Sequence, residues 1–192
     1  MGAGYRRGML VWINGPFGVG KTATAFELHR RLPGSAVANP EHVGYSMRRM
    51  LPASLRVNFQ DIPAWRSAVG ELLRRTLTDY DGPVIAPMTV VNQGYFREII
   101  GGLRDDGFEV HHFALLAEPA TVVRRLRARS EWLDVLRQPE FAEQVHTDHK
   151  TVAQVADIIA STAGLPITPP SGGPLRAWVR RYATTVRHVR WN

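Results

Sequence analysis

The feature that most constrains this chain is the octapeptide Gly-Pro-Phe-Gly-Val-Gly-Lys-Thr at residues 15–22, which matches the pattern G-x-x-x-x-G-K-[ST]. In such a loop the glycines let the backbone curl until its N–H groups converge on phosphate oxygens. The helix that follows adds the positive end of its dipole. The motif therefore requires a strand before it and a helix after it.

The residues on both sides of the loop meet that requirement. The apolar run Met9–Ile13 predicts a strand, and residues 20–32 predict a helix that ends at Pro33-Gly34. The alternative is a glycine-rich turn with an incidental lysine, but such a turn would require neither the strand before it nor the helix after it. We therefore predict a phosphate-binding loop.

The predicted ligand of the loop is ATP with Mg²⁺. Lys21 is expected to reach the β- and γ-phosphates, and the Thr22 hydroxyl is expected to bind Mg²⁺. The residues predicted to bind the nucleotide at this loop are Gly15, Phe17, Gly18, Val19, Gly20, Lys21 and Thr22.

Two absences narrow the class of protein. Motor and GTPase members of the P-loop class carry an aspartate at the end of an apolar strand, where it helps to hold Mg²⁺. Here the apolar run Val84–Met88 ends without one, and the chain has no guanine-reading N-K-x-D motif. Both absences favour a small kinase.

Strand and helix patterns alternate along the rest of the chain. Further strands are predicted at residues 36–38, 83–88, 110–116 and 144–147, and helices at 40–51, 61–76, 96–107, 119–129 and 152–163. This alternation gives an α/β fold with a parallel sheet covered on both faces. We expect one domain over residues 1–164, a proline- and glycine-rich linker at 165–174 and a terminal helix at 175–192.

Charge and composition limit the partners. The formal charge is +7, but Asp157 is the last acidic residue and five arginines follow it, so the body is close to neutral. We therefore expect no nucleic-acid binding by the body. No run approaches the ~18 apolar residues that a membrane span needs, and the absence of cysteine fits a cytoplasmic protein.

The predicted terminal helix is amphipathic. One face carries Leu175, Trp178, Val179, Tyr182, Val186 and Val189, and arginines surround it. This pattern suits a helix that lies on an anionic membrane, which would place the protein peripherally on the inner face. The alternative is a helix packed on the domain with a solvated basic rim.

A second set of arginines precedes and enters an irregular stretch. Arg125 and Arg129 are four residues apart and share a helical face, and Arg137 follows. The planar guanidinium suits phosphate and the charge of a phosphoryl group in transfer. An exposed basic helix is the alternative, and we prefer it for Arg124 and Arg127.

Several segments together resemble the tunicamycin-resistance (TmrB-like) family of ATP-binding proteins. They are WINGPFGVGKTATAFELHRRL, NPEHVGYSMRRM, FQDIPAWR, VIAPMTVV, EIIGGLRDDGFEVHHFALLA and VVRRLRARS, and the resemblance covers about residues 8–192. More distantly the chain is similar to nucleoside monophosphate kinases and antibiotic phosphotransferases. The resemblance implies a three-layer P-loop kinase fold with a five-stranded parallel sheet and a helical lid.

The same resemblance assigns roles to the arginines, and it also reveals one position at which this chain departs from the family pattern. The R-x-x-x-R pair near ATP corresponds to Arg125 and Arg129, and the lid to about residues 130–143. Related small-molecule kinases have an aspartate at the end of the second strand, where this chain has Asn39. A neutral amide cannot take a proton from a hydroxyl.

If the reaction uses a catalytic base, that base must therefore be another residue. Asp61 is the first candidate and Glu41 the second. The alternative for Asp61 is a helix cap before Pro63. The resemblance implies a substrate pocket formed by the helices after the second and third strands, and the predicted substrate residues are Asn39, Glu41, Phe59, Asp61, Trp65, Met88 and Thr89. For Trp65 a place in the core is the alternative.

These inferences predict an ATP-dependent phosphotransferase that modifies a hydroxyl of a tunicamycin-type nucleoside antibiotic. The predicted catalytic residues are Lys21, Asp61, Arg129 and Arg137. Two alternatives remain open: an ATP-binding protein that sequesters the drug without chemistry, and a kinase for a metabolite or nucleotide.

Overall fold

The computed structural model describes residues 8–118, 120, 121 and 143–169. Five parallel strands form one sheet in the order β2-β3-β1-β4-β5. The strands are β1 (Met9–Asn14), β2 (Ala36–Val37), β3 (Val84–Pro87), β4 (Glu109–Leu116) and β5 (Glu143–His146). The prediction of a five-stranded parallel sheet is confirmed.

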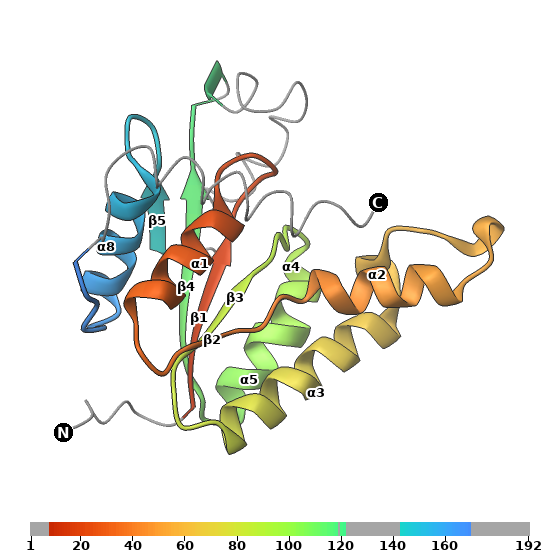
Figure 1. Cartoon of the computed structure of the whole chain (residues 1–192). Coiled ribbons are helices and arrows are strands. Elements are labelled where there is room, and N and C mark those ends of the chain that lie inside the picture. Colours follow the sequence, from red (N-terminus) through yellow and green to blue (C-terminus); the bar gives the residue numbers. More distant parts are fainter. Residues whose placement is uncertain (1–7, 119, 122–142, 170–192) are drawn as a thin grey trace.

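Helices cover both faces of this sheet (Figure 1). On one side lie α1 (Lys21–Arg31) and α8 (Val152–Thr162); on the other lie α3 (Pro63–Asp79), α4 (Gln93–Phe96), η3 (Arg97–Gly101) and α5 (Gly102–Asp105). The predicted helix at 96–107 begins earlier, at Gln93, and contains one π-helical turn, η3. Beyond the edge strand β2, α2 (Glu41–Met50) and the 3-10 turns η1 (Ala53–Leu55) and η2 (Phe59–Asp61) form an arm with α3.

The central strand explains why the sequence folds this way. All six residues of β1 are buried, and Leu10 to Ile13 are fully inaccessible. A strand that is covered on both faces needs a continuous apolar run rather than alternation, and MLVWI supplies it.

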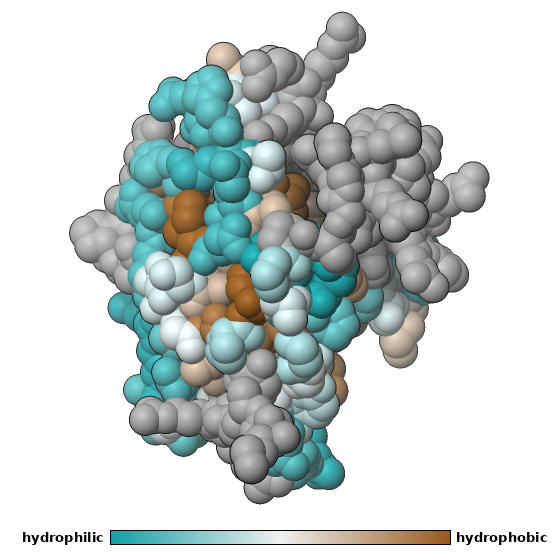
Figure 2. Space-filling model, turned by 60° about the vertical axis from the view of Figure 1, so that its left-hand side comes forward, coloured by the Kyte–Doolittle hydropathy of each residue, from teal (hydrophilic) through white to brown (hydrophobic). Residues whose placement is uncertain are grey.

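On the side that carries α8 and β5, hydrophilic side chains dominate the described surface and hydrophobic ones form small patches (Figure 2).

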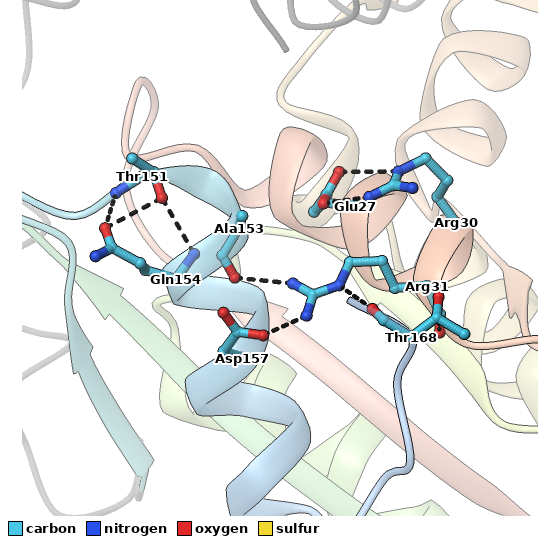
Figure 3. A network of polar contacts seen from close by, with 8 residues as sticks. All are labelled: Glu27, Arg30, Arg31, Thr151, Ala153, Gln154, Asp157 and Thr168. Atoms are coloured by element: carbon cyan, nitrogen blue, oxygen red, sulfur yellow. Dashed lines mark hydrogen bonds and ion pairs between the residues drawn. The ribbon is translucent and has the colours of Figure 1, made fainter. Parts of the chain in front are cut away.

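Buried Arg31 attaches the chain that follows α8 to the body (Figure 3). Its Nε donates to the Thr168 carbonyl at 2.7 Å, its Nη1 donates to the Ala153 carbonyl at 3.1 Å, and its guanidinium pairs with Asp157. Residues 165–169, the first half of the predicted linker, therefore run along α1 and α8. The predicted terminal helix lies outside the described residues, and no helix in the described part is long and apolar enough to cross a membrane.

Candidate nucleotide and acceptor site

The phosphate loop leaves the carboxyl end of β1 with three glycines in the left-handed region. Gly15, Gly18 and Gly20 have φ values of 145°, 82° and 108°. At Gly15 a Cβ would also come within 2.8 Å of the Leu115 carbonyl oxygen, so only glycine lets the loop pass β4. Gly20 then precedes the first turn of α1. The geometry is that of a backbone cradle at a helix N-terminus.

Asn14, a residue that the sequence analysis missed, holds the entrance to the loop. Its fully buried side chain accepts hydrogen bonds from the N–H of Gly15 at 2.8 Å and of Val90 at 3.1 Å. Its Nδ2 donates to the Val90 carbonyl at 2.8 Å. The only local signal for this role is a polar residue between an apolar strand and a glycine.

Thr89 braces the same loop from the chain after β3. Its buried hydroxyl donates to the Gly15 carbonyl at 2.7 Å. The side-chain amide of Gln60, on η2, donates to the Thr89 carbonyl at 3.0 Å. The structure thus commits the Thr89 hydroxyl, predicted to line the substrate pocket, to the phosphate loop, and it adds Gln60 as a link to the arm.

Lys21 is buried at the start of α1 and lies back on the loop. Its Nζ donates to the Pro16 carbonyl at 3.2 Å and stands 5.9 Å from the centroid of the exposed Phe17 ring. Burial lowers the pKa of Lys21 to about 8, an effect that the negative charge of Glu41 partly opposes. A phosphate beside this ammonium would supply the anionic partner that the buried charge favours.

Glu41 is the carboxylate whose charge acts on Lys21. It opens α2, where its N–H donates to Asn39 Oδ1 at 3.0 Å. The Tyr45 hydroxyl, one turn later, donates to Glu41 Oε2 at 3.4 Å. Burial, and then the negative charge of Glu41, raise the pKa of Tyr45. The side chain of Asn39 thus binds the N–H of the first residue of α2, while the residue at the N-cap position is Pro40.

Asp61 has a different environment. It is exposed at the end of η2, and its Oδ1 accepts a hydrogen bond from the Tyr95 hydroxyl at 3.1 Å. The residue that caps α3 is Ile62, without a side-chain hydrogen bond, so the alternative of Asp61 as a cap is wrong by one position. The Tyr95 ring also stacks under Arg66, whose guanidinium carbon lies 4.1 Å from the ring centroid.

The remaining substrate candidates differ in burial. Trp65 is fully buried and donates from Nε1 to the Pro40 carbonyl at 3.2 Å, and Met88 is 2% exposed, so both belong to the core. Phe59 is half-buried, with its ring 5.2 Å from that of Trp65. At Gly44 a Cβ would come within 2.5 Å of the Phe59 ring, and this close approach fixes α2 against η2.

The predicted arginines lie outside the described residues. They are Arg125, Arg129 and Arg137, together with residues 130–142 of the predicted lid. Among residues 8–118, 120, 121 and 143–169, no cluster of three or more histidine and acidic side chains is arranged to hold a metal ion.

Comparison with known proteins identifies the family. A family model described as an AAA domain matches residues 10–155. The structure of a tunicamycin resistance protein from Deinococcus radiodurans is similar, with a TM-score of 0.76 and 35% identity over 84% of this chain and 99% of that chain. The chain belongs to the tunicamycin-resistance family. The resemblance found in the sequence is thereby confirmed.

This family member also shares its fold with several kinases. An APS kinase from Mycobacterium tuberculosis, in complex with AMPPNP and APS, is 16% identical with a TM-score of 0.60, over 83% of this chain and 99% of that chain. A sugar kinase from Janibacter sp. HTCC2649 is 16% identical with a TM-score of 0.59, over 82% of this chain and 95% of that chain. At such identities the likeness shows the fold alone, which is P-loop kinase-like. No curated protein sequence matches the chain.

Proposed function

We propose that this protein transfers the γ-phosphoryl group of ATP to a hydroxyl of a tunicamycin-type nucleoside antibiotic. The observation that carries the proposal is the buried ammonium of Lys21 on the phosphate loop, which leaves the carboxyl end of β1. A buried lysine cation lies on the phosphate loop, and the carboxylate of Glu41 acts on it from the arm. Such a site can hold a phosphate donor on one side and a hydroxyl acceptor on the other.

The donor side is assigned to the phosphate loop. Its backbone N–H groups and Lys21 are proposed to bind the triphosphate, and Thr22, at the first turn of α1, is proposed to hold Mg²⁺. When bound, Mg²⁺ would neutralise phosphate charge. The glycine conformations and the buried ammonium fit this ligand. Arg125 is proposed to contact ATP, and Arg129 with Arg137 to stabilise charge on the phosphoryl group in transfer.

The acceptor side needs a carboxylate, and the structure supports Glu41 over Asp61. The negative charge of Glu41 raises the pKa of Lys21 against the effect of burial, and the Tyr45 hydroxyl donates a hydrogen bond to the Glu41 carboxylate at 3.4 Å. Asp61 is exposed and accepts a hydrogen bond from Tyr95. We therefore propose that Glu41 orients the acceptor hydroxyl and takes its proton, which reverses the order that the sequence suggested. Phosphoryl transfer depends mainly on positioning and charge neutralisation, so a modest base is sufficient.

The tunicamycin-type acceptor is supported by the family. The Deinococcus relative is named a tunicamycin resistance protein and is 35% identical to this chain. The kinase neighbours support the reaction class through the fold that they share with it.

Sequestration of the drug without chemistry is the second candidate. One observation favours it: Asn39, at the position where related kinases carry an acid, is a neutral amide whose oxygen accepts a hydrogen bond from the N–H of Glu41. A binding protein needs ATP only as a ligand that shapes the pocket. A metabolite or nucleotide kinase is the enzymatic alternative.

Turnover separates these candidates. The full chain is incubated with ATP–Mg²⁺ and a large molar excess of tunicamycin, and in parallel with a panel of nucleosides and sugars. The proposal predicts ADP beyond one equivalent per protein and a drug that gains the mass of one phosphoryl group by mass spectrometry. A stoichiometric complex with unmodified drug and no ADP would establish sequestration instead. Phosphorylation of a panel compound, but not of the drug, would establish a metabolite kinase.

A further inference from the structure

The outer end of the arm exposes apolar side chains that the site does not use. Of the six large hydrophobic residues that the described surface exposes, three lie between residues 50 and 57. Met50 is 84% exposed, Leu55 58% and Val57 53%. Single exposed hydrophobic residues are ordinary on protein surfaces, but a local concentration marks an interaction site.

The position of these residues at the end of the arm supports the interpretation as an interaction site. α2 runs away from the sheet, and the segment after it stands at the outer end of the arm (Figure 1). Met50 ends α2, and Leu55 ends η1. We call Arg48, Met50, Leu55, Arg56 and Val57 the arm tip.

The charge of the arm tip is of one sign. Between Glu41 and Asp61 the chain carries three arginines, Arg48, Arg49 and Arg56, and no acidic residue. Arg48 and Arg56 are exposed, and the Nε of Arg56 donates to the Leu51 carbonyl at 3.1 Å, which holds its side chain on this segment. Exposed apolar side chains among arginines are the pattern of a surface that enters the headgroup region of an anionic bilayer.

We infer that the arm tip docks on an anionic lipid bilayer. The arginines would meet acidic headgroups while Met50, Leu55 and Val57 enter the interface. A protein partner fits less well, because a stable protein interface uses about 20–30 residues a side and the tip offers far fewer. This contact does not involve the helix predicted at 175–192.

Docking at the tip would also place the site beside the membrane. α2 has ten residues, so it spans about 15 Å between the tip and Glu41, the first residue of the helix, whose charge acts on Lys21. An amphiphilic acceptor that partitions into the bilayer would then reach the site over a short distance. The docking itself does not depend on the proposed reaction, and vesicle binding without any phosphorylation would separate the two.

The first experiment measures co-sedimentation of the full chain with vesicles of phosphatidylcholine, with and without 30 mol% phosphatidylserine. The double variant Arg48→Gln/Arg56→Gln should lower the partition coefficient on phosphatidylserine vesicles roughly 30-fold, because each arginine near such a surface contributes about a factor of five. Salt should weaken binding of the native chain. Arg97→Gln is the matched control for Arg56, since Arg97 is exposed and its Nε likewise donates to a carbonyl, that of Gln93 at 3.4 Å.

The second experiment reports on insertion of the arm tip even if residues 175–192 dominate the overall affinity for vesicles. The chain has no cysteine, so Leu55→Cys can carry a single polarity-sensitive dye. Its emission should shift to the blue on phosphatidylserine vesicles and stay unchanged with phosphatidylcholine alone. Leu72→Cys is the matched control, because Leu72 is 55% exposed on α3, close to the 58% of Leu55.

The outcomes decide the proposal. A blue shift at Leu55 alone, together with weaker binding of the double variant, supports it. No shift at Leu55, or equal shifts at both positions, overturns it. If light scattering shows that the tip substitutions dissociate a dimer while vesicle binding is unchanged, the tip is an interface between copies of the chain and the proposal is wrong.

Discussion

The two sides of the site are built differently. The phosphate loop is held by buried hydrogen bonds: Asn14 is fully inaccessible, and Thr89, whose hydroxyl donates to the Gly15 carbonyl, is 5% exposed. On the acceptor side, Glu41 is half-buried and Asp61 is exposed. A buried network that satisfies all its members rigidifies a structure, whereas exposed pairs contribute little.

This difference indicates which part of the site has its final geometry before a ligand binds. The loop that would bind phosphate has its shape before any ligand arrives, because each buried polar group that we describe there has its partner. The acceptor side stands on α2 and η2, where Glu41 is half-buried and Asp61 is exposed, so we expect the geometry of its acids to depend on what it binds. We expect substitutions on the donor side to affect binding of ATP and folding, and those on the acceptor side to affect the rate.

The largest effect is expected at Lys21. Lys21→Ala removes the buried ammonium, and ATP affinity should fall on the order of 1000-fold, since unit charges 4 Å apart near a protein surface interact by about 4 kcal/mol. Resistance should be lost while circular dichroism stays native. Lys150→Ala is the control, because Lys150 is the other lysine of the chain and is exposed. Unchanged affinity of Lys21→Ala in calorimetry would remove the loop assignment.

Substitution of Asn14 and of Asn39 tests how much each side of the site contributes to the free energy of unfolding. Asn14→Ala leaves the N–H of Gly15 and both backbone groups of Val90 without their partner, and should lower the free energy of unfolding by about 3 kcal/mol. Asn39→Ala removes one partly exposed hydrogen bond at the start of α2 and should cost about 1 kcal/mol. Urea unfolding of both variants measures the difference. Equal losses would mean that the donor side is no more rigidly built than the arm.

The two acids of the acceptor side, Glu41 and Asp61, are expected to differ in their effect on kcat. Glu41→Gln should lower kcat about 100-fold, the lower end of the range for a general base, because phosphoryl transfer relies little on one. Asp61→Asn keeps an acceptor for the Tyr95 hydroxyl and should leave kcat nearly unchanged. Steady-state ADP release, at saturating ATP and drug, measures both. A large loss for Asp61→Asn with a small one for Glu41→Gln would restore the order suggested by the sequence.

The sequence predicted the donor side better than the acceptor side for a physical reason. The motif at 15–22 and the buried run of β1 are local patterns, and they fix the loop and the sheet. The contacts of Asn14 with Val90 and of Thr89 with Gly15 join residues 76 and 74 positions apart, so no local pattern reports them.

On the arm the sequence left burial undecided. A helix that packs at the edge of a domain presents its aromatic residues either to the core or to a pocket, and periodicity does not distinguish the two. Trp65 was open to both interpretations, and the structure buries it. The order of Glu41 and Asp61 also depends on which acid acts on the charge of Lys21, and that relation between α2 and the start of α1 is not contained in a local sequence pattern.

The smallest effect is expected in the pH dependence of ATP affinity, which Lys21 on the donor side and Glu41 on the acceptor side determine together. Lys21 has a pKa of about 8 without ligand, lowered by burial and partly restored by Glu41. Below pH 8 the ammonium is already charged, so this residue adds no pH dependence to affinity. Above pH 8 binding must take up a proton, and affinity should fall with rising pH by up to about tenfold per unit.

Glu41→Gln removes the negative charge that favours protonated Lys21, so the pKa of the lysine should fall further and the break in the affinity profile should move below pH 8. At pH 8 the variant should then bind ATP more weakly by a factor of less than about ten, while at pH 6 the loss of an acid near the phosphates should leave affinity equal or higher. Asp61→Asn should leave the break where it is, because Asp61 does not act on Lys21. Calorimetric titration of the three proteins between pH 6 and 9 tests this. A common break in all three would mean that Glu41 and Lys21 are not coupled, and the acceptor side would then lose its link to the phosphate loop.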